Sequence, residues 1–341
     1  MTNILYIIGA GASANVLPII NRFRDDKGNN RLSLIEELLD FTSKINTNQN
    51  YKIYYDLCIE ALGFTTPDTF AKFLYVTNRD WDYIRFKQII SAYFFWKEEF
   101  SDDCLDTRIL SFLTTLSDVN GLFPKNIKII SWNYDRQFIK AIEQANRKIP
   151  NQTFAHNFKR FPAVQDSTTD KMDLPFIHLN GVAGYAFNER MQRCYNKMND
   201  IDTPGQSLVD SFKRQGFDEG EIIKSIFNKF SIPNEHLLIS YAWEKEFKSQ
   251  RDYKFSNEKI EYSRALARAA DILVVIGYSF PFFNREIDKL IFSEMPTLQK
   301  IYFQDPYLNG DFLYSQFSLN RDRVKIEHIP NVKNYYVPYE L

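Results

Sequence analysis

The sequence predicts an α/β fold: a Rossmann-like, doubly wound and mostly parallel sheet with helical insertions. Seven short runs of β-branched or aromatic residues recur along the chain, and several are apolar at successive positions. Strands covered by helices on both faces have this pattern. Between the runs, apolar residues recur at helical spacing, for example from Leu34 onward and after Asp135. Strands that alternate with helices in this way are typical of a doubly wound sheet.

The expected strands lie at 4–8, 127–131, 176–179, 237–240, 272–276, 301–304 and 324–329. Two intervals are too long to be loops without structure of their own, so we expect them to be insertions. Interval 31–122 is expected to be a helical module, with helices near 67–76 and 83–100, and interval 182–233 a partly helical one, with helices near 207–214 and 221–230. The Rossmann-like core then comprises 1–30, 123–181 and 234–341, and the whole chain, 1–341, forms a single domain.

Composition narrows the class of protein. The 341 residues include 42 basic and 43 acidic side chains, which give a net charge of −1. We therefore expect no general attraction to nucleic acid or to an anionic membrane. No run approaches the roughly 20 apolar residues of a membrane span, and we expect a cytoplasmic protein. Cys58, Cys104 and Cys194 are widely spaced and odd in number, so neither a disulfide framework nor a cysteine-rich zinc site is expected.

The most informative segment is Gly9-Ala10-Gly11-Ala12-Ser13, which directly follows the apolar run at 4–8. Glycines let such a turn bring its N–H groups close to a pyrophosphate, whose charge the N-terminus of a following helix stabilises. Ser13 can add a hydroxyl donor. The spacing is shorter than the full G-x-G-x-x-G, and a tight turn without ligand is the alternative.

Three further segments, 131–135, 178–181 and 277–281, place polar residues or glycine where expected strands end. Ligands of open α/β sheets bind outside the carboxyl ends of the strands, so we expect the four segments to converge on one crevice.

In this order the segments resemble the motifs of the sirtuin-like superfamily. The matching residues are G-A-G-x-S at 9–13, Ser131 to Asp135, Leu179-Asn180-Gly181 and Ile276 to Pro281. The resemblance extends from Ile4 to about Asp305, and it is closer to the bacterial NAD⁺-hydrolysing effectors of antiphage defence than to the protein deacylases. The deacylases carry a module of four zinc-binding cysteines that this chain lacks. The resemblance therefore implies NAD⁺ cleavage, with no metal.

The resemblance also assigns residues to parts of the dinucleotide. It implies a phosphate-binding turn at Gly9, Ala10, Gly11 and Ser13, a catalytic amide at Asn133, a cofactor contact at Asp135, an adenosine-side segment at Gly277 and Ser279, and a ribose contact at Asp305. The amide of Asn133 can orient water and a ribose through one acceptor and two donors. Each assignment has a structural alternative: Asn133 and Asp135 are also typical helix caps, and Asp305 is a typical turn residue.

Position 180 departs from the family pattern. The family has a histidine general base there, whereas Asn180 cannot take up a proton near neutral pH and is expected only to contact the cofactor. His178 is two residues earlier on the same face of the strand, so we predict that it replaces the base, against the alternative of a structural histidine. His156 is a weaker substitute.

The first hypothesis is thus a NAD⁺ glycohydrolase that acts as the toxic effector of a bacterial antiphage defence system. It is expected to be latent until a sensor or activator protein, or assembly into a homo-oligomer, closes its site. The second is an inactive NAD⁺-binding sensor or scaffold subunit, in which Asn180 marks the loss of chemistry. A protein deacylase is a weaker alternative. No membrane or direct nucleic-acid partner is expected.

Overall fold

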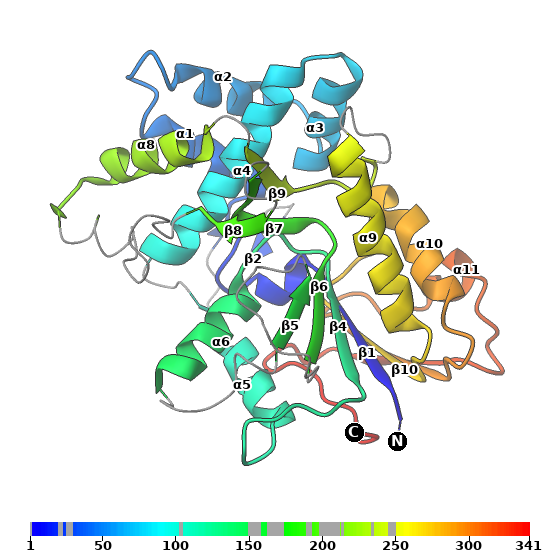
Figure 1. The fold of residues 1–341 in the computed structure, drawn as a ribbon. Coiled ribbons are helices and arrows are strands. Elements are labelled where there is room, and N and C mark those ends of the chain that lie inside the picture. The colour runs from blue at the N-terminus through cyan, green and yellow to red at the C-terminus, as the bar shows by residue number, and fades with distance from the viewer. Residues whose placement is uncertain are drawn as a thin grey trace.

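The computed structural model describes residues 2–19, 23–24, 30–101, 105–148, 158–161, 174–188, 193–197, 212, 215–232, 235–244 and 250–341. Its centre is a seven-stranded sheet in which every neighbouring pair is parallel (Figure 1). The strands lie in the order β12 (Lys325–Ile329), β11 (Lys300–Gln304), β10 (Ile272–Ile276), β1 (Ile4–Ile8), β4 (Ile127–Ser131), β6 (Leu174–His178) and β5 (Phe158–Phe161). The predicted α/β fold class is confirmed.

The strand order defines where a ligand site belongs. From β1 the chain first builds one side of the sheet with β4, β5 and β6, and later builds the other side with β10, β11 and β12. The order reverses between β1 and β10, and crevices of doubly wound sheets open at the carboxyl ends of strands beside such a point. The glycine turn follows β1 at this position.

Helices bury both faces of the sheet, which explains the continuously apolar strands. Ile4, Tyr6 and Ile8 pack in a core with helices α5 (Thr107–Leu116) and α6 (Gln137–Lys148). Leu5 and Ile7, which point to the opposite face, pack in a core with α9 (Gln250–Ala267), α10 (Arg285–Ser293) and α11 (Phe312–Gln316). Successive side chains of a strand alternate between faces, so all five residues of β1 are buried.

A helical module lies beyond the carboxyl ends of the strands (Figure 1). It comprises α1 (Leu34–Ser43), α2 (Lys52–Ala61), α3 (Pro67–Val76) and α4 (Asp80–Phe100), against which α8 (Glu219–Phe230) packs. Local signals set the helix starts: Ser33 and Glu36 form a capping box at α1, and Thr66 caps α3 ahead of Pro67.

The expected strand at 237–240 was wrong in its placement. Strand β9 (Glu235–Ile239) is not part of the parallel sheet; it pairs antiparallel with β7 (Gly181–Asn188), which also pairs with β8 (Arg193–Asn196). A short apolar run does not reveal its partner, and here the partner is the strand that directly follows the Leu179-Asn180 turn. The second insertion therefore begins as a strand, while α8 covers the expected helix near 221–230. Most of the expected helix near 207–214 lies outside the described residues.

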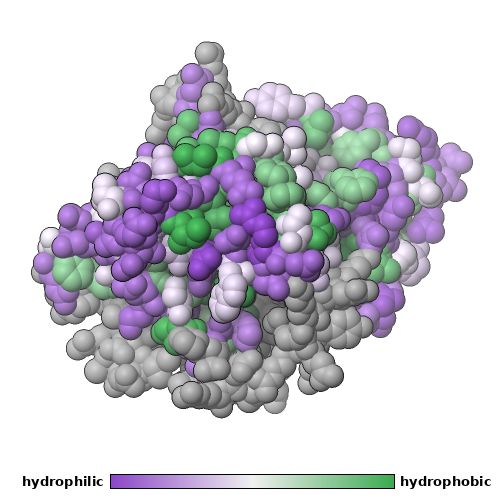
Figure 2. Space-filling model, turned by 90° about the horizontal axis from the view of Figure 1, so that it is seen from above, coloured by the Kyte–Doolittle hydropathy of each residue, from purple (hydrophilic) through white to green (hydrophobic). Residues whose placement is uncertain are grey.

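Two short strands, β2 (Phe23–Arg24) and β3 (Asn30–Arg31), form a separate antiparallel pair. Within the described ranges, we find no helix that is both long and apolar enough to cross a bilayer. Seen from above, apolar groups are scattered among polar ones (Figure 2). The exposed large apolar side chains of helices α2 to α4 and the turns between them are Ile53, Ile59, Leu62, Val76, Trp81 and Ile84.

Candidate functional site

The glycine turn is interlocked with the end of β10. The Gly9 amide donates to the carbonyl of Ile276 (3.0 Å), and the Gly11 amide donates to that of Gly277 (2.9 Å). A Cβ on Gly9 would lie 2.6 Å from the Gly277 carbonyl oxygen, and one on Gly277, whose φ is +57°, would lie 2.2 Å from the Ala12 nitrogen. Glycine is therefore needed here for two strand ends to approach each other.

This arrangement corrects the expected phosphate turn in two respects. The amides of Gly9, Gly11 and Ala12 donate within the protein, Ala12 to the Gly9 carbonyl at 2.9 Å, so fewer donors remain than the motif suggests. The turn is also followed by a single 3₁₀ turn, Ala10–Ser13, rather than by a long helix, because α1 begins only at Leu34. The exposed tip of the turn is Ala10-Gly11.

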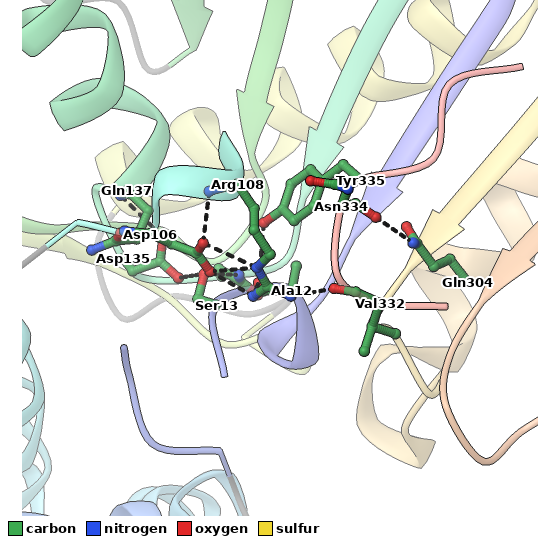
Figure 3. Close-up of polar contacts among 11 residues, drawn as sticks. Ala12, Ser13, Asp106, Arg108, Asp135, Gln137, Gln304, Val332, Asn334 and Tyr335 are labelled. Carbon is green, nitrogen blue, oxygen red and sulfur yellow. Dashed lines mark hydrogen bonds and ion pairs between the residues drawn. The ribbon is translucent and has the colours of Figure 1, made fainter. Parts of the chain in front are cut away.

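Ser13, Asn133 and Asp135 meet at the carboxyl ends of β1 and β4. The Ser13 hydroxyl donates to Asp135 Oδ2 (2.9 Å) and accepts from Asn133 Nδ2 (3.3 Å), and all three side chains are buried. Asp135 Oδ1 accepts from the amide of Gln137, the first residue of α6 (3.2 Å). Asp135 thus does what its structural alternative predicts, holding the start of a helix, and also contacts Ser13 (Figure 3).

The environment of Asp135 is unfavourable for a negative charge. Burial is the larger cause that raises the pKa of Asp135 to about 7, and the nearby Glu98 carboxylate is the second. Hydrogen bonds from Ser13, Gln137 and Asn133 lower the pKa, but by less. Asp135 therefore changes charge near neutral pH, where an ordinary aspartate is fully ionised.

The Glu98 carboxylate connects the helical module to this site. It lies on α4, is fully buried and accepts from the Arg136 amide (2.9 Å), Arg136 Nε (3.3 Å) and Gln137 Nε2 (2.9 Å). Arg136 also pairs with Glu99 and lies over the Phe95 ring, 4.6 Å from its centroid. The start of α6 is thus held by a buried, hydrogen-bonded ion pair.

His178 and Asn180 lie on the neighbouring strand end. His178 Nδ1 is 3.3 Å from the main-chain oxygen of Asn133, its ring packs edge-on against Phe176, and 1% of the residue is exposed. This burial favours a role in holding Asn133 over direct contact with substrate. Asn180 Nδ2 donates to the Trp132 carbonyl (2.9 Å). His156 lies outside the described residues.

Two buried amide oxygens at this edge, Asn133 Oδ1 and Asn180 Oδ1, have no hydrogen-bond partner in the described part of the chain. Buried polar atoms are seldom left unpaired, so each oxygen can accept from a ligand or from water. The exposed Ala10-Gly11 tip lies at the end of the adjacent strand.

The residues expected on the adenosine side lie at the ends of β10 and β11. Gly277 contacts the glycine turn, whereas Ser279 is exposed and its hydroxyl makes no hydrogen bond within the described chain. Asp305 Oδ1 accepts from the amides of Tyr307 and Leu308 (both 2.8 Å), which is the turn-capping alternative. Asn284 Nδ2 donates to the Tyr278 hydroxyl (2.9 Å), which donates to Asp288.

Two further buried polar contacts lie next to the strand ends of the site. Lys259 Nζ donates to the Leu179 carbonyl (2.9 Å) and the Ser240 hydroxyl (2.6 Å), and burial lowers its pKa to about 8. Tyr134 donates to Asp68 of α3 (3.1 Å), and burial raises the pKa of that carboxyl to about 6. The contact of Tyr134 with Asp68 joins the helical module to the end of β4, and Lys259 of α9 joins the ends of β6 and β9.

Sequence reasoning missed the residues beneath the glycine turn. These residues are Arg108 of α5, Gln304 of β11 and Tyr335 of the C-terminal segment, residues 331–336. Arg108 and Tyr335 bind the main chain of the turn, and Gln304 binds the main chain of the C-terminal segment (Figure 3). None belongs to a recognisable motif, since each acts on main-chain atoms far away in the sequence. Within the described part of the chain, no three His, Cys, Asp or Glu side chains lie close enough to hold a metal ion.

Comparisons with known proteins do not assign a family. No family model matches the chain, and no curated protein matches it. Solved structures similar to it include Sir2Tm bound to a propionylated peptide, at 12% identity and a TM-score of 0.38, covering 96% of this chain and 87% of that one. Another is a Sir2 complex with a deacetylated peptide and 3′-O-acetyl ADP-ribose, at 12% identity and a TM-score of 0.35, covering 96% and 88%. A structure titled for the basis of sirtuin substrate affinity has 13% identity and a TM-score of 0.36, covering 97% and 89%.

Proposed function

We propose that this chain binds NAD⁺ and hydrolyses the bond between nicotinamide and ribose. The observation that carries the proposal is the triad of Ser13, Asn133 and Asp135 at the carboxyl ends of β1 and β4. The Asn133 amide oxygen is left without a protein partner among the described residues. The order of the four strand-end motifs, which resembles that of the sirtuin-like superfamily, supports the choice of NAD⁺.

The reaction converts NAD⁺ and water into nicotinamide, ADP-ribose and a proton. The bond from ribose C1′ to the pyridinium nitrogen breaks with its electron pair moving to nitrogen, and water forms the new bond to C1′. In this proposal the exposed Ala10-Gly11 tip holds the diphosphate. Ser13 holds the Asn133 amide in place, and Asn133 orients the attacking water and the ribose hydroxyls. Gly277, Ser279 and Asp305 line the adenosine side.

Because the leaving nicotinamide is neutral, positioning matters more here than strong deprotonation of water. General-base catalysis is typically worth about 10²- to 10⁴-fold. Asn180 supplies no base, so in this proposal His178 supports Asn133 through its main-chain contact, and Asn180 contributes its free amide oxygen to the ribose. Slow basal turnover follows from this arrangement.

We further propose that the chain is a gated effector of antiphage defence, activated by a sensor partner or by assembly. Depletion of NAD⁺ would harm the host cell, so low basal activity is expected. The contacts of Glu98 and Asp68 support such gating, because they link the helical module to the residues of the site. Asn180 favours a second candidate, a NAD⁺-binding sensor subunit without catalysis.

The test is nicotinamide release from NAD⁺ by purified protein, alone and with products of neighbouring genes. We expect turnover that falls at least about 100-fold in Asn133→Ala, the scale on which loss of a catalytic polar group is felt. A matched control is Asn228→Ala, which removes an exposed amide on α8 that bonds Tyr51. Binding of NAD⁺ without turnover in any assembly would support the sensor instead.

A further inference from the structure

The carbonyl of Ala12, in the middle of the glycine turn, is held by two side chains from distant parts of the chain. Arg108 Nη2 donates to it at 2.6 Å, and the Tyr335 hydroxyl donates to it at 3.1 Å (Figure 3). Ala12 and Tyr335 are both buried, whereas Ala10 and Gly11 are exposed. The Ala12 carbonyl therefore faces the buried side of the turn.

Arg108 is itself held in place by its neighbours. Asp106 caps α5 by accepting from the Arg108 amide (3.0 Å), and the same carboxylate accepts from Arg108 Nε (3.0 Å). Arg108 Nη1 donates to the Val332 carbonyl (2.9 Å), and its guanidinium lies over the Tyr335 ring, 5.6 Å from the centroid. The planar guanidinium of Arg108 thus joins the glycine turn to the C-terminal segment.

Gln304, at the end of β11, holds the C-terminal segment through hydrogen bonds to its main chain. Its Nε2 donates to the carbonyls of Asn331 (2.6 Å) and Asn334 (2.7 Å), and its Oε1 accepts from the Tyr336 amide (3.0 Å). The Gln304 carbonyl also accepts from the Gly277 amide (3.1 Å). Tyr335 therefore contacts the glycine turn from a segment whose main chain is held by hydrogen bonds to Gln304.

From these contacts we infer that Arg108 and Tyr335 are positioning residues that preset the glycine turn for a diphosphate, an inference that rests on the proposed binding of NAD⁺. If the Ala12 peptide reversed, its carbonyl oxygen would face the exposed side and repel an anion. Holding that oxygen below the turn removes the alternative conformation before a ligand arrives. The gain is one of preorganisation, so it affects affinity for phosphate-bearing ligands.

Titration calorimetry with two probes tests this inference. ADP-ribose contains the diphosphate, and adenosine lacks any phosphate. Tyr335→Phe removes one hydroxyl, and we expect it to weaken ADP-ribose binding by about threefold to tenfold, as loss of a single hydrogen bond does, with adenosine binding unchanged. Arg108→Lys keeps the charge but cannot bind Ala12, Val332 and Asp106 together, and we expect it to weaken ADP-ribose binding further.

The matched control is Tyr314→Phe on α11, whose hydroxyl donates to the main-chain carbonyl of Val324 (3.0 Å), on the β12 side of the sheet. It should leave both affinities unchanged. Unaltered ADP-ribose binding in Tyr335→Phe would overturn the inference, and so would equal weakening of both probes, which indicates a general structural defect. If the wild-type protein binds no ADP-ribose, the proposed function itself fails. Should Arg108→Lys not fold, Tyr335→Phe alone decides.

Discussion

Replacing Asp135 by asparagine should make the protein more stable at alkaline pH while impairing its site. The pKa of Asp135 is raised to about 7, chiefly by burial and next by Glu98, whereas an aspartate in the unfolded chain titrates near 3.9. A raised folded-state pKa means that this carboxyl favours folding most below pH 3.9 and that the benefit is lost as pH rises through 7. The difference of about three pKa units corresponds to about 4 kcal/mol.

Asparagine has nearly the same shape but no charge to desolvate. We therefore expect the gain in unfolding free energy from Asp135→Asn to grow from about 1.5 kcal/mol at pH 5 to about 4 kcal/mol at pH 8. Urea unfolding of both proteins across this range measures it, with the exposed Asp56→Asn on α2 as the control. Nicotinamide release should fall in the same variant. A stability difference that stays constant from pH 5 to pH 8 would refute the assignment of the raised pKa.

Two further predictions concern stability. Gly277→Ala should destabilise the protein by at least about 2 kcal/mol, measured by thermal unfolding. A Cβ at this position would lie 2.2 Å from the Ala12 nitrogen, and the φ of +57° disfavours residues other than glycine. The control is Gly63→Ala, which should change stability far less because its added Cβ would make an ordinary contact at 3.5 Å. Glu98→Gln should lower the free energy of unfolding by about 3 kcal/mol, because the buried Arg136 charge loses one of its carboxylate partners. It should also lower the pKa of Asp135, which the pH dependence of unfolding measures. An unchanged pH dependence would contradict the proposed effect of Glu98 on the pKa of Asp135.

The sequence revealed those parts of the molecule that depend on local pattern. Strands β1 and β10 follow from runs of successive apolar residues, because both faces of the sheet are covered. Helix α3 follows from a capping threonine before Pro67. The meeting of Ser13 and Asn133 follows from parallel strands whose carboxyl ends share one edge.

What escaped prediction depends on contacts between distant segments. The antiparallel pairing of β9 with β7 requires glycine at the first residue of β7, because a Cβ on Gly181 would lie 1.4 Å from the Leu238 carbonyl oxygen. The contact of Tyr335 with Ala12 joins residues 323 positions apart. The interlocking of Gly9 with Gly277 is likewise invisible in the sequence, since a glycine in a motif does not reveal which backbone it admits.

The most direct test of the proposed function is a crystal structure of the protein with ADP-ribose. We predict a diphosphate oxygen within about 3 Å of the Ala10 amide at the Ala10-Gly11 tip, as a hydrogen bond requires, and the distal ribose against the free oxygens of Asn133 and Asn180. A diphosphate bound at another edge of the sheet, with the glycine turn and Asn133 left untouched, would contradict the proposal.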